Sequence, residues 1–321
     1  MKPNAIATAG VLAEWRASTD GDDVVVKRAF QRLLHTISHL SSHPPNGFLS
    51  CVADRGPARA ASLLAEPFGI RDWHLVEEAT FASLCLDVFA HAIDDIADES
   101  EGDRIVLAHV GSLLLARAAQ GYARLVGGDQ AFWACWERYL REASEAERFL
   151  HQHRYSFEQI SLEMLGQKSS LINTSVALYA TLTGRWNLCE PLEHGLMAVA
   201  TGIQLIDDLL DWEEDITSGV DTYPLTLAAQ RCEGGGSVRD SINSNSVFAE
   251  VVDLARTKME EGQVHFRDVE ATRMVSFVSS LIAKLVAVRK QVAHSLAPDA
   301  GTGENRRIEQ LRWIMGRRLG H

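Results

Sequence analysis

Two groups of aspartates have the residue type and the spacing of metal ligands. The first lies in "DVFAHAIDDIADE" (residues 87–99) and contains Asp94, Asp95 and Asp98. The second lies in "GIQLIDDLLDWEED" (residues 202–215) and contains Asp207, Asp208, Asp211 and Asp215, with Gln204 one turn earlier. On a helix, spacings of three and four residues set like charges side by side, at a cost of about 0.2–0.5 kcal/mol per pair. Such crowding indicates that each group holds a cation.

The chemistry of these groups favours Mg²⁺. Each contains or follows an apolar run that we expect to be buried, and carboxylates at the end of a buried helix require a cation. Oxygen ligands without a histidine or cysteine cluster are typical of Mg²⁺ sites. An EF-hand would need glycine where Ile216 stands, and the Glu-x-x-His pairs of a di-iron bundle are absent. The alternative, two solvated acidic faces, is disfavoured because the Asp-Asp-x-x-Asp pattern occurs twice, about 110 residues apart.

Helices must position both groups, because apolar residues recur every three or four positions along nearly the whole chain. We therefore predict an all-α fold, with a single domain over residues 1–321 that contains ten or more helices. The predicted helices span residues 23–42, 58–66, 73–98, 103–125, 129–151, 154–183, 190–216, 223–232, 246–263, 268–296 and about 305–318. The stretch "EGGGSVRDSINSNS" (233–246) is predicted to be a loop.

Composition and charge limit the function further. The 321 residues are 46% hydrophobic and 7% aromatic, and they carry a formal net charge of −12. No compensating basic patch stands out, so we expect no nucleic-acid partner, although a bound metal ion would still allow an acidic ligand. The five scattered cysteines indicate reduced thiols, and neither a signal peptide nor a long apolar span is evident. We therefore expect a cytoplasmic protein without a membrane span.

Three segments together resemble the class I isoprenoid synthase superfamily, which contains the trans-isoprenyl diphosphate synthases and the class I terpene synthases. "IDDIADE" resembles the first aspartate-rich motif of that family, and "GIQLIDDLLDWEED" resembles the second. "LGQKSSLI" (165–172) resembles its Lys-Thr segment, with Lys168 and Ser169 in the matching places. The similarity covers about residues 80 to 230. It implies an all-α bundle around a central active-site cavity, an allylic prenyl diphosphate substrate of C10–C20, and a homodimer.

The resemblance also implies a role for each matching residue. Three Mg²⁺ ions would bind the diphosphate, held by Asp94, Asp95, Asp98, Asp207, Asp208, Asp211 and Asp215. Lys168 would contact the departing diphosphate, and Gln204 would orient it or the carbocation. Phe89, five residues before Asp94, would limit the prenyl chain length, unless it belongs to the core. Two further roles follow from position and not from the resemblance. His91, on the same helical face as the first aspartates, would donate to a carboxylate or to the diphosphate, and Trp212, next to Asp211, would stabilise the cation unless it belongs to the core.

The sequence departs from the chain-elongating members of the family at their second, basic site. The Gly-Lys-Arg segment expected near "HPPNGFLSCVADRG" is missing, and only Arg104 stands where paired arginines are expected after the first motif. Val220 and Asp221 replace the Gly-Lys expected after the second. Because lysine and arginine grip phosphate, these losses favour a terpene synthase that binds one allylic diphosphate. The alternatives are a chain-elongating prenyltransferase with a shifted site around Arg55, Arg59 and Arg104, and a non-catalytic regulatory subunit.

Overall fold

Helices make up almost all of the structure. The computed structural model describes residues 21–40, 56–98, 101–152, 162–219, 221–232, 237–243 and 245–294. Within these ranges the chain forms thirteen α-helices and two 3-10 helices and no β-strand, which confirms the predicted all-α fold. The helix predicted near 305–318 lies outside the described residues. The chain divides into two compact units, each described here by itself, and the single domain stays a prediction.

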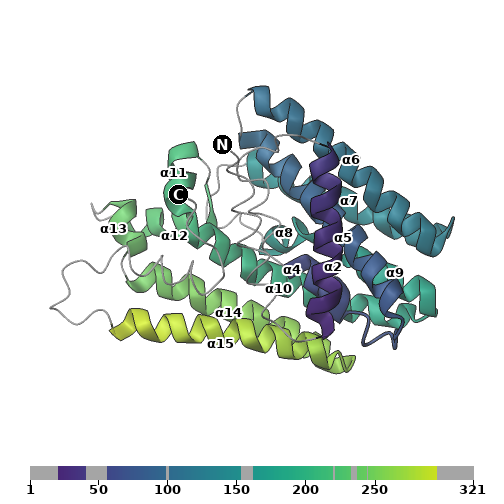
Figure 1. Ribbon diagram of the computed structural model, residues 1–321. Coiled ribbons are helices and arrows are strands. Elements are labelled where there is room, and N and C mark those ends of the chain that lie inside the picture. Colours follow the sequence, from purple (N-terminus) through teal and green to yellow (C-terminus); the bar gives the residue numbers. More distant parts are fainter. Residues whose placement is uncertain are drawn as a thin grey trace. The chain divides into compact units, whose positions relative to one another are not determined.

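The first unit contains residues 1–136 and 171–189 and is organised around the long helix α5 (Trp73–Asp98). Four helices pack on α5 (Figure 1): α2 (Gly21–Leu40), α4 (Gly56–Leu63), α6 (Glu101–Val126) and α9 (Thr174–Thr183). The start of α7 (Gln130–Gln152) and the 3-10 helix η3 (Trp186–Leu188) complete it, and η2 (Ser170–Asn173) spans the boundary between the units. The close approach of α6 to α5 depends on Gly121, because a Cβ there would lie 2.9 Å from the Cβ of Ala82.

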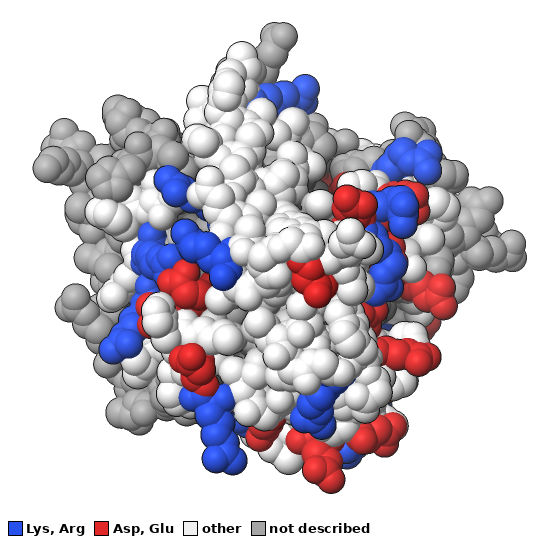
Figure 2. Space-filling model, turned by 90° about the vertical axis from the view of Figure 1, so that its right-hand side faces the viewer, with Lys and Arg blue, Asp and Glu red and all other residues white. Residues whose placement is uncertain are grey.

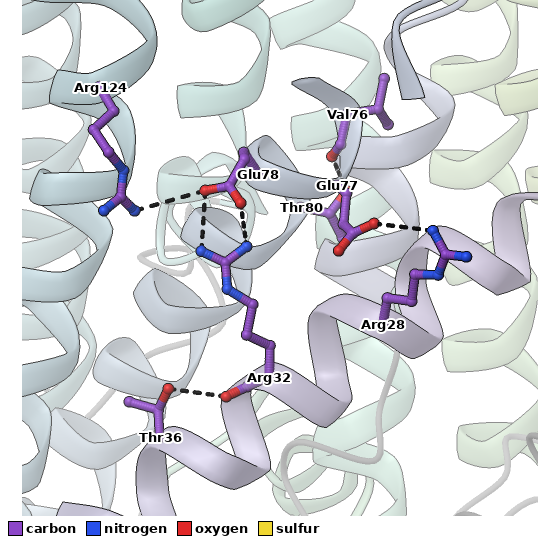
Figure 3. A network of polar contacts seen from close by, with 8 residues as sticks. All are labelled: Arg28, Arg32, Thr36, Val76, Glu77, Glu78, Thr80 and Arg124. Carbon is purple, nitrogen blue, oxygen red and sulfur yellow. Dashed lines mark hydrogen bonds and ion pairs between the residues drawn. The ribbon is translucent and has the colours of Figure 1, made fainter. Parts of the chain in front are cut away.

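A polar network fixes α2 and α6 to the first half of α5 (Figure 3). Arg32 of α2 donates two hydrogen bonds to the carboxylate of Glu78, one of them 3.0 Å long, and Arg124 of α6 lies 3.6 Å from the same carboxylate. Arg28, one turn before Arg32 on α2, lies 3.6 Å from the carboxylate of Glu77 on α5. The hydrogen bond from Arg32 lowers the pKa of Glu78, so this carboxylate stays charged and holds the two helices.

The second unit contains residues 137–170 and 190–321, and α10 carries its acidic motif. Besides the rest of α7, its helices are α8 (Leu162–Gln167), α10 (Cys189–Leu210), α11 (Trp212–Ser218), α12 (Tyr223–Arg231), α13 (Val238–Asn243), α14 (Asn245–Asp268) and α15 (Thr272–His294). The helices α14 and α15 form a hairpin (Figure 1). Glycines allow α10 to lie directly on α14, because a Cβ at Gly202 would be 2.7 Å from the carbonyl oxygen of Ala255.

The observed helices follow the predicted ones, with three differences. The helix predicted over 73–98 has the same bounds in the structure. The helix predicted over 154–183 is interrupted by a turn at residues 168–169, and the one predicted over 190–216 is divided at Asp211. The short helix α13 lies inside the predicted loop 233–246. Both interruptions fall at residues with predicted functional roles, which makes them part of the candidate site.

The surface of the molecule carries both signs of charge. Figure 2 shows one face on which a broad uncharged area is bordered by acidic and basic side chains, with no single patch of either sign. None of the helices in the described ranges has the length and apolar character needed to cross a bilayer. Four cysteines, namely Cys85, Cys135, Cys189 and Cys232, are free thiols, and Cys51 lies outside the described residues.

Candidate active site

The last two turns of α10 place the second aspartate group. Gln204 and Asp208 are four residues apart and therefore lie on one side of the helix. The Gln204 Nε2 atom donates a hydrogen bond of 2.7 Å to Asp208 Oδ1. Asp207, the neighbour of Asp208, is half-buried. The apolar residues before them, including Leu205 and Ile206, are buried in the core, so the helix is anchored and its acidic end is held in place.

Asp208 is a buried carboxylate in an acidic environment. Its exposure is only 8%, and burial raises its pKa from 3.8 to about 7. The hydrogen bond from Gln204 opposes this shift, whereas the charges of Asp207 and Asp215 add to it. Lys168 is close enough to lower the pKa slightly. At neutral pH the charged form of Asp208 is therefore under-stabilised, and a cation would stabilise it.

A break in the helix brings the next two aspartates to the same end. Asp211 has φ −101° and ψ 8°, which ends α10 and makes it the N-cap residue of α11. The amide of Asp215, in the first turn of α11, donates to the Asp211 carbonyl at 3.0 Å. Burial raises the pKa of Asp215 to about 7, the charges of Asp211 and Glu214 add to the effect, and the nearby Thr222 hydroxyl opposes it. Among the described residues, Asp215 Oδ2 is buried without a well-formed hydrogen bond.

These carboxylates fit a divalent metal ion by their chemistry. The pKa of Asp208 and that of Asp215 are each raised to about 7 by burial and by neighbouring acidic groups, and Asp215 Oδ2 has no well-formed hydrogen bond to the described residues. A hard cation such as Mg²⁺ would supply the missing charge and take oxygen ligands of this kind. Among the described side chains, no three groups from His, Cys, Asp and Glu already lie close enough together to hold a metal ion. The side chains of the first aspartate group lie outside that description.

The turn that carries Lys168 is fixed against two helices of the second unit. Gly166 of α8 packs directly on α10, where a Cβ would lie 2.7 Å from both the Met197 carbonyl oxygen and Thr201 Oγ1. On the other side, Ser170 Oγ donates a buried hydrogen bond of 2.8 Å to the carbonyl of Tyr139 on α7. The residues on either side of Lys168 are held in this way, which fixes the backbone of the turn.

Lys168 also has an acidic partner that the sequence did not suggest. Its Nζ atom lies 3.4 Å from Oε2 of Glu147 on α7, and both side chains are about three-quarters buried, with exposures of 26% and 23%. The two residues are 21 positions apart, and no motif or helical spacing links them. This partner could be found only from the packing of α7 against the turn.

The first aspartate group occupies the last two turns of α5. Asp94, Asp95 and Asp98 belong to this helix, as predicted, but their side chains lie outside the described residues. One turn earlier, His91 Nδ1 lies 3.0 Å from the backbone carbonyl oxygen of Asp87, on its own helix. The roles proposed for these residues stay predictions.

Two aromatic residues with predicted roles lie in packed surroundings. Phe89 is half-buried on α5 and lies close to Gly111 of α6. Trp212 is 2% exposed, the guanidinium of Arg239 lies 5.6 Å from its ring centre, and its indole Nε1 has no hydrogen-bond partner among the described residues. Arg239 is in turn paired with Glu213 at 2.9 Å. Trp212 thus occupies the core beside the acidic cluster, and its contact with a substrate stays a prediction.

Proteins similar to this chain are found among solved structures. Neither a family model nor a curated protein matches the sequence. Among solved structures, the chain is similar to the apo form of an Arabidopsis medium/long-chain length prenyl pyrophosphate synthase. The two chains are 16% identical, the similarity covers 92% of this chain and 97% of that chain, and the TM-score is 0.49. The all-helical structure agrees with the all-α fold that the motif resemblance implied.

Proposed function

We propose that the protein is a Mg²⁺-dependent class I terpene synthase, which ionises an allylic prenyl diphosphate and cyclises or rearranges the resulting carbocation. The observation that carries this proposal is the partly buried acidic group at the end of α10 and the start of α11, in which Asp208 is buried and interacts with Lys168. Asp208 and Asp215, whose pKa values are both raised to about 7, would gain most from a divalent cation. A lysine at the edge of such a cluster suits the phosphate groups that the cation would bind.

In this proposal the two aspartate groups hold three Mg²⁺ ions. Their ligands are Asp94, Asp95, Asp98, Asp207, Asp208, Asp211 and Asp215. Mg²⁺ held by these aspartates would supply positive charge for the diphosphate leaving group. Gln204 keeps the Asp208 carboxylate in position through its hydrogen bond, and Lys168 contacts the departing diphosphate. Phe89, His91 and Trp212 are proposed contacts of the substrate, and their bulk would also help to keep water from the carbocation.

The choice of cyclisation over chain elongation rests on missing basic residues. A second diphosphate substrate would need its own lysine and arginine side chains. After the second motif the chain carries Val220 and an exposed Asp221, and Asp221 would repel a diphosphate. The alternative basic site named above would include Arg55 and Arg104. Arg104 is exposed at the start of α6, and Arg55 lies outside the described residues. We therefore propose that a single allylic diphosphate is bound.

The proposal is tested by the products formed. The purified protein is incubated with Mg²⁺ and a C10, C15 or C20 allylic diphosphate, with and without isopentenyl diphosphate. A hydrocarbon or alcohol from the allylic substrate alone is expected. Longer diphosphates formed only with both substrates would instead identify a chain-elongating enzyme, and no release of diphosphate in any mixture would favour a regulatory subunit. Asp95→Ala and Asp208→Ala are expected to abolish turnover while circular dichroism shows an unchanged helical content.

A further inference from the structure

We infer that Glu147 is a positioning residue, which holds the Lys168 ammonium in place for a metal-bound diphosphate. This inference rests on the proposed function, in which Lys168 contacts the diphosphate. The carboxylate of Glu147 lies 3.4 Å from Lys168 Nζ, and both side chains are mostly buried at the surface where α7 meets the turn after α8. None of the sequence motifs includes Glu147.

The surroundings of Lys168 restrict its backbone but not the end of its side chain. The turn is fixed by the packing of Gly166 on α10 and by the hydrogen bond from Ser170 to Tyr139 on α7. The lysine side chain still has four flexible carbons, and it loses rotamer freedom when it binds an anion. The ion pair with Glu147 already restricts the lysine rotamers before the substrate binds. Less rotamer entropy is then lost on binding, and the affinity for the anion is higher.

The charges on the two sides of Lys168 explain why it is held where it is. Glu147 attracts the ammonium from α7, and Asp208 on α10 also interacts with it. A metal ion held by Asp208 would offset the attraction of that carboxylate for the ammonium, whereas the carboxylate of Glu147 would still attract it. Glu147 then keeps Lys168 at the edge of the site, available to the oxygens of the diphosphate.

The test measures binding of inorganic pyrophosphate in the presence of Mg²⁺ by isothermal titration calorimetry, together with turnover of the allylic diphosphate. We expect Glu147→Gln to weaken pyrophosphate binding and to raise KM by about fivefold, with kcat nearly unchanged, which is the size expected for an incompletely buried ion pair. Glu147→Asp should recover part of the loss. The control is Glu145→Gln, which removes the same charge from an exposed position on the same helix and should change neither quantity.

A double-mutant cycle separates positioning from a general effect on structure. Glu147→Gln should have no further effect on pyrophosphate binding in a Lys168→Ala background, because Glu147 acts only through that lysine. If Glu147→Gln binds pyrophosphate as tightly as the unaltered protein or more tightly, the inference is wrong. It is also wrong if Glu147→Gln weakens binding equally with and without Lys168→Ala. Either result would leave the proposed function standing. Absence of Mg²⁺-dependent pyrophosphate binding by the unaltered protein would overturn the proposed function and the inference with it.

Discussion

Replacing Asp208 with asparagine should make the metal-free protein more stable and the enzyme inactive. Asparagine has nearly the same shape as aspartate, and its Oδ1 can still accept the hydrogen bond of 2.7 Å from Gln204. The substitution removes only the charge, at a position that is 8% exposed and lies beside Asp207 and Asp215. The charge of Asp208 destabilises the metal-free fold, but the proposed metal site requires it. Removing this charge should therefore raise stability and abolish activity.

The size of the effect follows from the raised pKa. A shift of the Asp208 pKa from 3.8 in the unfolded chain to about 7 in the folded one corresponds to roughly 4 kcal/mol at 1.36 kcal/mol per unit. Between these two values the folded state holds the proton and the unfolded state does not, so the free energy of unfolding falls as the pH rises. The loss is complete above the folded pKa. At pH 5 less than half of it has developed, so the advantage of Asp208→Asn should shrink by roughly 2–3 kcal/mol between pH 8 and pH 5.

Urea unfolding followed by circular dichroism, without added metal, measures this difference. At pH 8 we expect Asp208→Asn to raise the free energy of unfolding by about 4 kcal/mol and turnover to be lost. The control is Asp268→Asn, an exposed position at the end of α14, where the change should stay within about 0.5 kcal/mol. If the variant is no more stable than the unaltered protein at pH 8, or if its advantage is the same at pH 5, the burial argument for Asp208 is wrong.

Three further predictions concern the metal and the packing of the helices. Mg²⁺ affinity, measured by calorimetry, should rise from pH 6 to pH 8 by about tenfold for each carboxylate that must lose its proton, because the pKa values of Asp208 and Asp215 lie near 7; a pH-independent affinity would contradict this. Glu78→Gln should lower the free energy of unfolding by about 1–2 kcal/mol in urea, since Arg32 loses its charged partner, and should leave kcat unchanged. Gly202→Ala should cost about 1–3 kcal/mol in thermal unfolding, because its Cβ would meet the backbone of α14, whereas Gly128→Ala, with open space around it, should not.

The sequence alone predicted the all-α fold class and the helix that carries the first aspartate group. Apolar residues repeat every three or four positions, and this period depends only on helix geometry, so it is readable without tertiary contacts. The helix 73–98 was predicted with its observed bounds, and the first aspartate group lies at its end as expected. Asp207 and Asp208 of the second group also lie at the end of an apolar helix as expected, whereas Asp211 and Asp215 follow the end of that helix.

The tertiary structure alone decided where the predicted helices stop and which carboxylates are buried. The helical period continues through residues 168 and 211, so the breaks there depend on contacts made elsewhere, such as the hydrogen bond from Ser170 to Tyr139. Asp207 and Asp208 are equivalent in the sequence, yet only Asp208 is buried, because burial depends on the elements that pack around each side chain. The pairing of Glu147 with Lys168 joins residues 21 positions apart on different helices. A local sequence pattern specifies which residues are neighbours along one helix. The raised pKa of Asp208 and the ion pair between Glu147 and Lys168 depend instead on contacts between different helices, which form only in the folded chain.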